Sequence, residues 1–395
     1  MATFKRIAVF GSSGSIGCNA LEVIRRYPAR FKAQALCVNS QIDILRAQMG
    51  ALRPALVCVT DRSAARRLRS APGKKAGSVK VLSGYEGMEA LCADRSIDHV
   101  LIAISGAAAL SVLLKAIEHG KEVSLANKEA LVMAGPIIMA AARRHKVIIR
   151  PIDSEQSAIW QCLNGAQDTQ VKAVYLTASG GPFRGWTKKQ LSHITLAQAL
   201  KHPRWKMGRK ITVDSATLMN KGLEILEAIA LFNLRPEQVR VVVHPQSVIH
   251  SMVEFVDGAI MAQLSVPDMR IPIQYALSYP ERLRGVCPPV DFVDLRALSF
   301  ETPDSERFPS LLLAYEAARR GGTLPCVLNA ANERAVEAFL HEEIGFSAIA
   351  ELVARVMRKH RTVDQPSLND ILEADSWARA AAEKLLSGTV KPSRR

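Results

Sequence analysis

Residues 6–17 read Arg6-Ile7-Ala8-Val9-Phe10-Gly11-Ser12-Ser13-Gly14-Ser15-Ile16-Gly17, and this stretch sets the fold class that we expect. An apolar run that ends in glycines predicts a buried strand followed by a tight turn into a helix. Glycine at every third position lets the turn close sharply, brings the backbone near a pyrophosphate and lets the helix lie against the strand. The N–H groups and the dipole at the start of that helix favour an anion.

The glycine spacing is GxxGxxG, whereas GxGxxG is the commoner dinucleotide-binding pattern. Its position directly after the first strand favours dinucleotide binding over a purely structural turn. The second expected strand ends at Asn39-Ser40-Gln41, and no acid stands before Asp43 to hold the ribose diol of NAD. We therefore predict NADPH, whose 2′-phosphate would be accepted at Asn39 and Ser40. The alternative is that Ser40 only caps the helix Gln41–Met49.

Outward from this stretch, short apolar runs alternate with helical patterns as far as residue 150. The expected strands are Arg6–Phe10, Ala33–Val38, Ala55–Val59, Val79–Leu82, His99–Ile104, Glu122–Leu125 and Val147–Arg150. The helical patterns between them include Asn19–Tyr27, Ala107–His119 and Lys128–His145. Apolar strands that alternate with helices are typical of a parallel sheet covered on both faces. We therefore predict an N-terminal Rossmann-like α/β domain over residues 1–150.

The pattern changes after residue 150. Val171–Ala178 predicts a strand, a polar loop covers His202–Lys210, and a helix is expected near Ala216–Phe232. The runs Arg240–His244, Val248–Val256 and Ala259–Ser265 are spaced like an antiparallel meander. Such a sheet with helices on one side predicts a central α+β domain over residues 151–279.

The last part of the chain is expected to be helical. Residues 280–308 are rich in proline, as in Cys287-Pro288-Pro289, and we interpret them as a linker. Helical periods follow at Leu311–Arg319, Val327–His341, Phe346–His360 and Leu368–Leu386. We predict a C-terminal α-helical bundle over residues 309–395.

Composition excludes several classes of protein. The net charge of +15 attracts anions, but aromatic residues make up only 5%, so a basic groove with stacking rings for nucleic acid is not expected. The seven cysteines form no CxxC pair and several lie in apolar runs, which favours buried thiols in a reducing compartment over disulfides or zinc. There is no signal peptide and no apolar stretch approaching the ~20 residues that span a bilayer, so we expect a cytoplasmic protein without a membrane partner.

Three acids stand out as candidate metal ligands. Asp153 and Glu155 follow the last strand of the first domain, and Glu224 lies in Asn220-Lys221-Gly222-Leu223-Glu224. Hard cations such as Mg²⁺ or Mn²⁺ prefer oxygen ligands of this kind. Spacing alone leaves two interpretations open: a metal site, or a helix cap at Asp153 or Ser154 with the acids facing water.

Several motifs together resemble the 1-deoxy-D-xylulose-5-phosphate reductoisomerase family. They occur in the family's order and span about residues 5 to 390. They are Gly11–Gly17, Ala126–Glu129, Asp153–Glu155, Ala178–Arg184, His202–Lys210, Asp214–Glu224, His244–Ser247 and Asn329–Glu333. Two departures are visible: many relatives have a glycine and a basic residue near Asn39-Ser40, and some have His where this chain has Gln156.

The resemblance implies a reaction and its helpers. Members rearrange 1-deoxy-D-xylulose 5-phosphate, a phosphorylated sugar, and reduce it with NADPH to 2-C-methyl-D-erythritol 4-phosphate on the non-mevalonate isoprenoid pathway. The family uses Mg²⁺ or Mn²⁺, with Co²⁺ as a further option, and its members are usually homodimers of three domains. An NADP-dependent Rossmann dehydrogenase of the semialdehyde or homoserine type is the alternative, and a basic nucleic-acid-binding protein ranks below it.

The resemblance also implies roles for single residues. The metal ligands would be Asp153, Glu155 and Glu224, and Lys128 would join them as a catalytic group between cofactor and substrate. Residues 202–210 would form a lid that excludes water. The substrate would contact Lys128, Ser154, Glu155, Ser179, His202, Trp205, Ser215, Asn220, Lys221 and Glu224. NADPH would contact Ser13, Gly14, Ser15, Ile16, Asn39, Ser40, Gln41, Asn127, Glu129 and Gly208.

Overall fold

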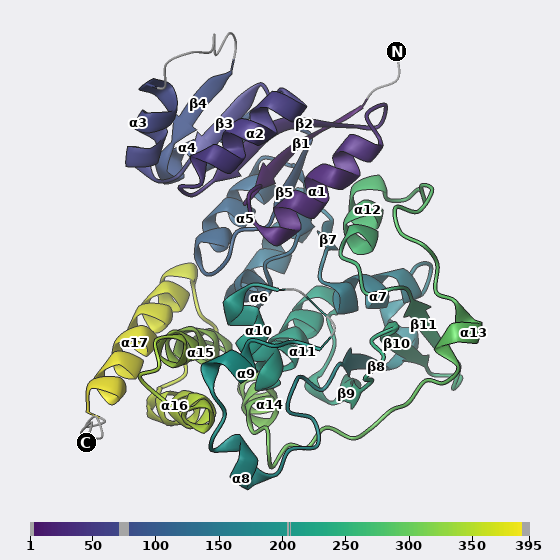
Figure 1. The fold of residues 1–395 in the computed structure, drawn as a ribbon, viewed down its shortest axis with the longest axis vertical. Coiled ribbons are helices and arrows are strands. Elements are labelled where there is room, and N and C mark those ends of the chain that lie inside the picture. The colour runs from purple at the N-terminus through teal and green to yellow at the C-terminus, as the bar shows by residue number, and fades with distance from the viewer. Residues whose placement is uncertain (1–3, 71–78, 204, 206, 389–395) are drawn as a thin grey trace. The chain divides into compact units, whose positions relative to one another are not determined.

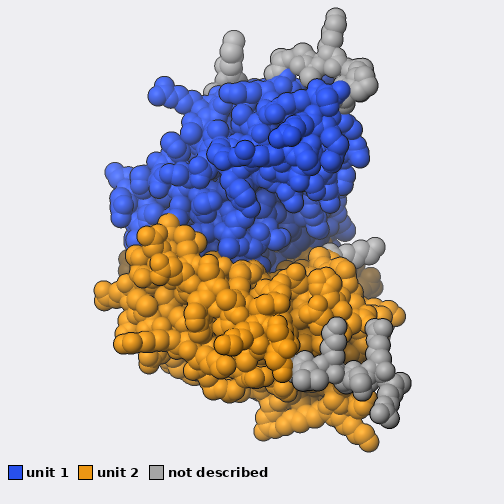
Figure 2. All heavy atoms as spheres, turned by 90° about the vertical axis from the view of Figure 1, so that its left-hand side faces the viewer, with its two compact units in different colours: residues 1–130, 138–160, 268–289 blue, residues 131–137, 161–267, 290–395 orange. Residues whose placement is uncertain are grey.

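The computed structural model describes residues 4–70, 79–203, 205 and 207–388. The chain forms two compact units, shown in blue and orange in Figure 2. The first comprises residues 1–130, 138–160 and 268–289, and the second comprises residues 131–137, 161–267 and 290–395. Within the described ranges, no helix is long and apolar enough to cross a membrane.

The first unit is built on a seven-stranded sheet in the order β4-β3-β2-β1-β5-β6-β7 (Figure 1). Every neighbouring pair of strands is parallel. The strands are β1 (Lys5–Phe10), β2 (Phe31–Val38), β3 (Leu56–Val59), β4 (Lys80–Ser83), β5 (His99–Ile102), β6 (Glu122–Leu125) and β7 (Ile149–Pro151). The predicted Rossmann-like parallel sheet is confirmed, with small differences at the strand ends.

Helices connect these strands and cover the sheet. They are α1 (Ser15–Arg26), α2 (Ile42–Leu52), α3 (Arg62–Ser70), α4 (Gly84–Ala93), α5 (Ala108–Glu118), α6 (Lys128–His145) and α7 (Ser154–Cys162). Alternate strand residues such as Ile7 and Val9 share one core with α1, α2 and α3, whereas Ala8 and Phe10 point to the other face. Both faces of the central strands are therefore buried, which explains their nearly continuous apolar sequences.

A helix from much later in the chain, α12 (Arg270–Ser278), belongs to this unit and shares its core through Ile273. Its last carbonyls accept hydrogen bonds from two cations: Lys5 Nζ reaches Leu277 O at 3.0 Å and Arg150 Nη1 reaches Ala276 O at 3.3 Å. The carboxylate of Glu122 binds both cations, at 2.7 and 2.9 Å. A hydrogen bond from His99, together with these two cations, holds the pKa of Glu122 well below the usual range. The helix dipole favours cations at the C-terminal end of a helix. These contacts therefore stabilise the packing of α12 against the sheet.

The second unit holds a four-stranded sheet in the order β11-β10-β8-β9. Its strands are β8 (Val171–Ala178), β9 (Val239–Val243), β10 (Ile249–Phe255) and β11 (Ile260–Leu264). The antiparallel pairing of β10 with β11 agrees with the predicted meander, but β9 does not lie beside β10. It pairs with β8 in parallel. The meander was wrong there because the helical crossover between β8 and β9 allows parallel pairing, which strand spacing alone does not reveal.

The helices of the second unit include one correction. The helix expected near Ala216–Phe232 is α11, which starts at Met219 because Leu218 before it has φ 60°, and a separate helix, α10, that was not predicted comes before it. The expected loop His202–Lys210 also ends early, since Arg209 and Lys210 form the first turn of α10. The helices and 3₁₀ turns are η1 (Asp168–Gln170), α8 (Lys188–Leu191), α9 (Leu196–Ala199), α10 (Arg209–Ala216), α11 (Met219–Phe232), η2 (Pro236–Gln238), α13 (Phe292–Leu295), α14 (Ser310–Arg320), α15 (Leu324–Leu340), α16 (Phe346–Lys359) and α17 (Leu368–Ser387).

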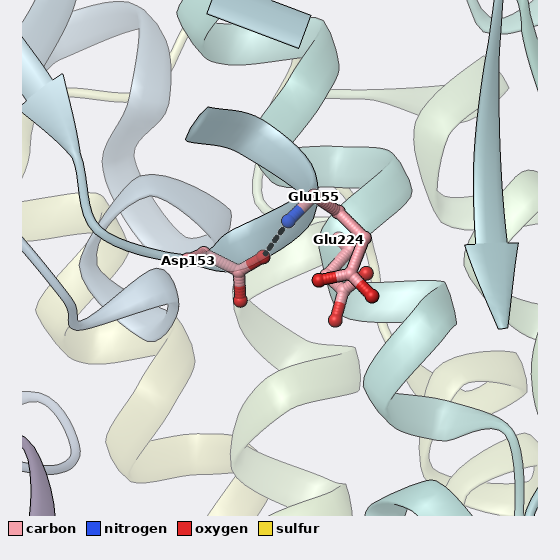
Figure 3. A group of neighbouring side chains, drawn as sticks. All are labelled: Asp153, Glu155 and Glu224. Atoms are coloured by element: carbon pink, nitrogen blue, oxygen red, sulfur yellow. Dashed lines mark hydrogen bonds between the residues drawn. The ribbon is translucent and has the colours of Figure 1, made fainter. Parts of the chain in front are cut away.

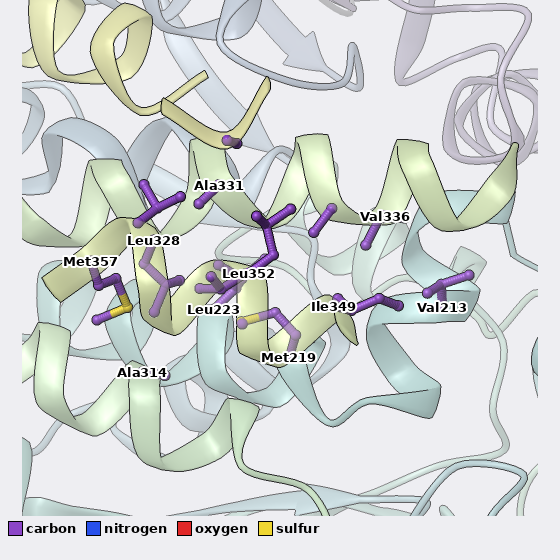
Figure 4. Packing of buried hydrophobic residues seen from close by; sticks show 14 of the residues in the cluster. Val213, Met219, Leu223, Ala314, Leu328, Ala331, Val336, Ile349, Leu352 and Met357 are labelled. Atoms are coloured by element: carbon purple, nitrogen blue, oxygen red, sulfur yellow. The ribbon is translucent and has the colours of Figure 1, made fainter. Parts of the chain in front are cut away.

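The predicted C-terminal helices are confirmed, and they share a core with α10 and α11. Figure 4 shows Val213 and Leu223 from α10 and α11 among side chains of α15 and α16, such as Leu328 and Ile349. Burying a side chain of this kind contributes about 1.5–3 kcal/mol. The segments that carry the candidate substrate residues therefore rest directly on the C-terminal helices.

Candidate active site

The glycine loop has the geometry of a tight strand-to-helix turn. Gly11 has φ +83°, and the N–H of Gly14 donates to Gly11 O at 3.0 Å. A Cβ on Gly17 would lie 2.2 Å from Gly11 O, so only glycine fits there. Helix α1 starts at Ser15 with Gly14 as its N-cap, which is earlier than the predicted Asn19. Ser13, Gly14, Ser15 and Ile16 thus lie at the start of a helix, as the motif predicts.

The end of β2 is fixed by its neighbour β3. Thr60 Oγ1 donates to Asn39 Oδ1 at 2.8 Å, and the N–H of Asp61 donates to Asn39 O at 3.1 Å. The N-cap of α2 is Gln41, and no side-chain hydrogen bond caps that helix, so Ser40 does not act as the cap. The pairing of Val38 with Val59 also places Arg62 close to this turn in the fold. The sequence interpretation missed Arg62 because it lies on another strand-to-helix turn.

Asn127 and Lys128 stand at the start of α6. Asn127 Oδ1 caps the helix by accepting from Ala130 N at 2.8 Å, and its Nδ2 donates to Ile104 O at 3.0 Å. Lys128 is buried, and its Nζ lies 2.6 Å from Asp153 Oδ2. Asp153 Oδ1 in turn accepts from the backbone N–H of Glu155 at 3.2 Å. One oxygen of Asp153 therefore accepts a backbone hydrogen bond at the start of α7, as the capping interpretation predicts, and the other pairs with Lys128.

The three acids predicted as metal ligands lie together. One carboxylate oxygen from each of Asp153, Glu155 and Glu224 lies within 4.8 Å of the others, and Figure 3 shows the three side chains. Asp153 and Glu155 are half-buried, and Glu224 is buried. Clustered carboxylates repel one another unless cations offset their charge, and oxygen ligands at this spacing suit a hard divalent ion.

Helix α11 presents three candidate side chains on one face. Asn220 Nδ2 donates to Glu224 Oε1 at 2.5 Å, and Lys221 Nζ forms a buried ion pair with Glu224 Oε2. Residues three and four positions apart lie on the same side of a helix, so the spacing in the sequence already implied this arrangement. Lys221 offsets the charge of Glu224 in a place where water is excluded.

Ser179 and His202 form a second group of donors. The backbone N–H of Trp205 donates to His202 Nδ1 at 2.9 Å, so the imidazole proton lies on Nε2, which is 3.2 Å from Ser179 Oγ. The N–H of Gly181 also donates to Ser179 Oγ, at 3.3 Å, and these two donors leave the hydroxyl proton to be given to a ligand. Burial lowers the pKa of His202 to about 4, so the ring is neutral near pH 7.

Two further predicted residues, Ser215 and Gly208, lie in the second unit. Ser215 is in α10, and a Cβ on Gly181 would lie 2.9 Å from Ser215 O, so the turn after β8 contacts the end of α10. Gly208 is the N-cap of α10. The predicted lid residues 204 and 206 lie outside the described residues.

The sequence interpretation missed His250 in β10. Its ring centroid lies 6.4 Å from that of Trp205, and burial lowers its pKa to about 4. Its Nε2 is buried and has no hydrogen-bond partner among the described residues. In the sequence, His250 lies six residues after His244 within a run that predicts an ordinary strand, so no local pattern indicated a role for it.

Comparison with known proteins decides the family. Models of "1-deoxy-D-xylulose 5-phosphate reductoisomerase", of its C-terminal domain and of "DXP reductoisomerase C-terminal domain" match residues 7–135, 149–232 and 264–381. The 1-deoxy-D-xylulose 5-phosphate reductoisomerase of Heliobacterium modesticaldum is 51% identical over 379 residues, which are 96% of this chain and 96% of that protein. The chain belongs to the 1-deoxy-D-xylulose 5-phosphate reductoisomerase family.

Solved structures of reductoisomerases agree with this chain over nearly its full length. The enzyme of Zymomonas mobilis, in complex with NADPH, has a TM-score of 0.91 at 41% identity and covers 98% of this chain and 100% of its own. A reductoisomerase in complex with NADPH, fosmidomycin and magnesium has a TM-score of 0.91 at 40% identity, with 97% and 98% covered. The predicted resemblance is confirmed, and the alternative of a semialdehyde or homoserine dehydrogenase is not favoured.

Proposed function

We propose that this chain converts 1-deoxy-D-xylulose 5-phosphate to 2-C-methyl-D-erythritol 4-phosphate with NADPH and a divalent metal ion, in isoprenoid biosynthesis. The observation that carries the proposal is the cluster of Asp153, Glu155 and Glu224. The chain that holds this cluster is 51% identical in sequence to a named reductoisomerase. A simple Rossmann dehydrogenase has no need of three clustered acids.

The metal ligands are Asp153, Glu155 and Glu224, and Mg²⁺, Mn²⁺ or Co²⁺ is the ion. Their oxygen donors fit a hard cation, and three protein ligands are fewer than such an ion takes, so substrate oxygens can complete its coordination. When bound, the ion supplies Lewis-acid polarisation of the ketone and its neighbouring hydroxyl. Lys128, at 2.6 Å from Asp153, holds that carboxylate in place and brings a second positive charge to the oxygens where negative charge develops.

The substrate phosphate and hydroxyls are bound by donors of several kinds. The hydroxyls of Ser154, Ser179 and Ser215, the imidazole of His202, the amide of Asn220 and the ammonium of Lys221 supply them. The neutral ring of His202 and the free hydroxyl proton of Ser179 suit a phosphate oxygen at this position. Remote binding energy of this kind is available to position the reacting carbons.

The loop 202–208, continued by Arg209 and Lys210 at the start of α10, acts as a lid over the substrate, and Trp205 covers it. The indole ring is half-buried and stands near His250. Closure of such a loop removes water from the reacting groups.

NADPH is held by the glycine loop residues Ser13, Gly14, Ser15 and Ile16, by Asn127, Glu129 and Gly208, and by the turn Asn39-Ser40-Gln41. The cofactor supplies hydride. We assign the cation for its 2′-phosphate to Arg62, an exposed guanidinium whose surface ion pair with Glu86, 2.9 Å long, contributes little and is easily exchanged. Arg62→Ala should weaken binding of 2′,5′-ADP but not of 5′-AMP, whereas Arg66→Ala, one turn later, should change neither. If Arg62→Ala and Arg66→Ala bound 2′,5′-ADP with equal affinity, Arg62 would be excluded as the residue that binds the 2′-phosphate.

The enzyme acts as a homodimer in the cytoplasm. Edge strand β11 exposes Ile260 and Met261, and α13 exposes Phe292 and Val293, which is apolar surface that a second copy would cover. All seven cysteines, each within the described ranges, are free thiols, as suits a reducing compartment. Sedimentation of the wild type as a monomer at micromolar concentration would contradict the dimer.

The decisive experiment follows NADPH absorbance with 1-deoxy-D-xylulose 5-phosphate, with and without EDTA. Oxidation should require the sugar phosphate, stop on chelation and return with excess Mg²⁺. NADPH oxidation that survives EDTA, or that occurs only with other carbonyl compounds, would overturn the proposal in favour of a dehydrogenase.

A further inference from the structure

The motif Asn329-Ala330-Ala331-Asn332-Glu333 has no part in the reaction as proposed, although it lies in the buried core of the C-terminal helices. Asn329 and Asn332 are both fully buried in α15, among apolar side chains of the second unit. A buried amide costs free energy unless it is hydrogen-bonded, and an apolar residue of the same shape would pack at least as well. The presence of Asn332 at this position therefore needs a reason.

Asn332 reaches out of α15 to a buried carboxylate. Its Nδ2 donates to Asp214 Oδ1 at 2.8 Å, and Asp214 is only 1% exposed. Its Oδ1 is buried and has no hydrogen-bond partner among the described residues, so the contact with Asp214 is the one that this structure shows for its polar atoms. The amide is thus oriented by the carboxylate alone.

Asp214 is held from a second side within its own helix. Lys210 Nζ lies 2.8 Å from Asp214 Oδ2, one turn earlier in α10. A buried carboxylate is tolerated only when its charge is paired and its other oxygen is hydrogen-bonded, and here Lys210 and Asn332 divide these tasks. The three side chains lock the rotation of α10 about its axis relative to α15.

Helix α10 links two parts of the candidate substrate site. It begins at Gly208, directly after the segment that carries His202 and Trp205, and it contains Ser215 next to Asp214. The turn Ser179–Gly181 contacts its last residues, as the close approach of Gly181 to Ser215 O shows. A rotation of α10 would therefore move the Ser215 hydroxyl and the end of the lid segment together.

We propose that Asn332 is a positioning residue, which fixes Asp214 and so sets α10 for the phosphate of the substrate. This role rests on the proposed function, since it concerns the same phosphate. The hydrogen bond from Asn332 also holds the Asp214 carboxylate where Lys210 pairs with its charge, which limits the repulsion between Asp214 and a phosphate at the neighbouring Ser215. The C-terminal helices thus tune substrate affinity without touching the substrate.

The test compares Asn332→Leu with Asn329→Leu, because leucine has the branching of asparagine and both positions are fully buried. Asn329 is the matched control, since its Nδ2 donates to Glu333 within α15 and not to α10. Asn332→Leu should raise KM for the sugar phosphate and the Kd of inorganic phosphate about tenfold, as expected when a hydrogen bond to a charged group is lost. NADPH affinity should stay at the wild-type value, although the melting temperature should fall, because the buried Asp214 carboxylate loses a hydrogen bond. A purely structural role would lower the melting temperature in the same way but leave the phosphate Kd unchanged, which would overturn the proposal.

A charge exchange gives an independent check if Asn332→Leu folds poorly. Asn332→Asp sets two carboxylates against each other and should weaken phosphate binding further, and adding Asp214→Asn should recover part of it by restoring one amide–carboxylate pair. Absence of recovery would contradict the positioning role. Lack of turnover in the wild type would count against the proposed function, whereas wild-type phosphate affinity in Asn332→Leu would count against Asn332 alone.

Discussion

The ammonium group of Lys128 lies 2.6 Å from the Asp153 carboxylate, and both side chains are largely shielded from water. Lys128→Gln removes the charge and keeps most of the volume. We expect kcat to fall about a hundredfold or more, because a fixed charge in a water-excluded site stabilises developing negative charge strongly. Mn²⁺ should still bind, since the carboxylates remain. Lys115→Gln, at an exposed lysine paired with Glu118, is the control and should keep wild-type kcat.

Glu224→Gln tests the metal site directly. It keeps the shape of the side chain but removes the charge that a divalent ion needs, and it leaves Lys221 without its paired carboxylate. Turnover should be abolished and Mn²⁺ affinity lost, whereas NADPH should bind as in the wild type. Glu237→Gln, at an exposed acid, serves as the control. Unchanged turnover in Glu224→Gln would remove it from the ligand set.

The local parts of this site could be predicted from the sequence because their geometry is local. The glycine turn after β1, the Asp153–Glu155 pair and the face of α11 with Asn220, Lys221 and Glu224 each follow from a few neighbouring residues. Helical periodicity likewise predicted α14 to α17.

The rest depends on contacts between distant residues. The parallel pairing of β9 with β8, the return of α12 to the first sheet and the approach of Asn332 to Asp214 leave no local pattern. His250 and Arg62 were missed for the same reason, since each gains its importance only from the neighbouring segment that the fold brings to it.

Trp205→Ala tests the lid. Loss of the indole ring should lower kcat about tenfold or more, because closure then excludes water less well. Stability should change little, since the ring is only half-buried. Trp377→Ala, at an exposed tryptophan of α17, is the control for loss of a large ring. A wild-type kcat in Trp205→Ala would contradict its assignment to the lid.

Gly17→Ala tests whether the close backbone approach in the glycine turn requires glycine, and Gly14→Ala is the control. A Cβ on Gly17 would lie 2.2 Å from Gly11 O, whereas one on Gly14 would lie 3.4 Å from that oxygen. We expect Gly17→Ala to shift the backbone, to destabilise the first unit by about 1–3 kcal/mol and to abolish NADPH binding. Gly14→Ala should keep wild-type stability in urea unfolding. Equal stability of the two variants would show that the close approach at Gly17 does not constrain the turn.

Burial of His250 predicts a loss of stability in mild acid. Its pKa is lowered to about 4 in the folded chain, against about 6.5 when unfolded, so between these values the unfolded state binds more protons. The free energy of unfolding therefore falls as the pH drops from 6.5 towards 4. At pH 5 this single group should account for a loss of about 2 kcal/mol relative to pH 8.

His250→Gln isolates that contribution. Urea unfolding at pH 8 and at pH 5 should give a difference between the two pH values that is smaller in His250→Gln than in the wild type, by about 2 kcal/mol. His341→Gln, at an exposed histidine, should keep the wild-type difference. Because His99 and His202 are also buried with lowered pKa values, some acid sensitivity should remain in His250→Gln. A pH difference identical to that of the wild type would mean that His250 is charged in the folded chain at pH 5.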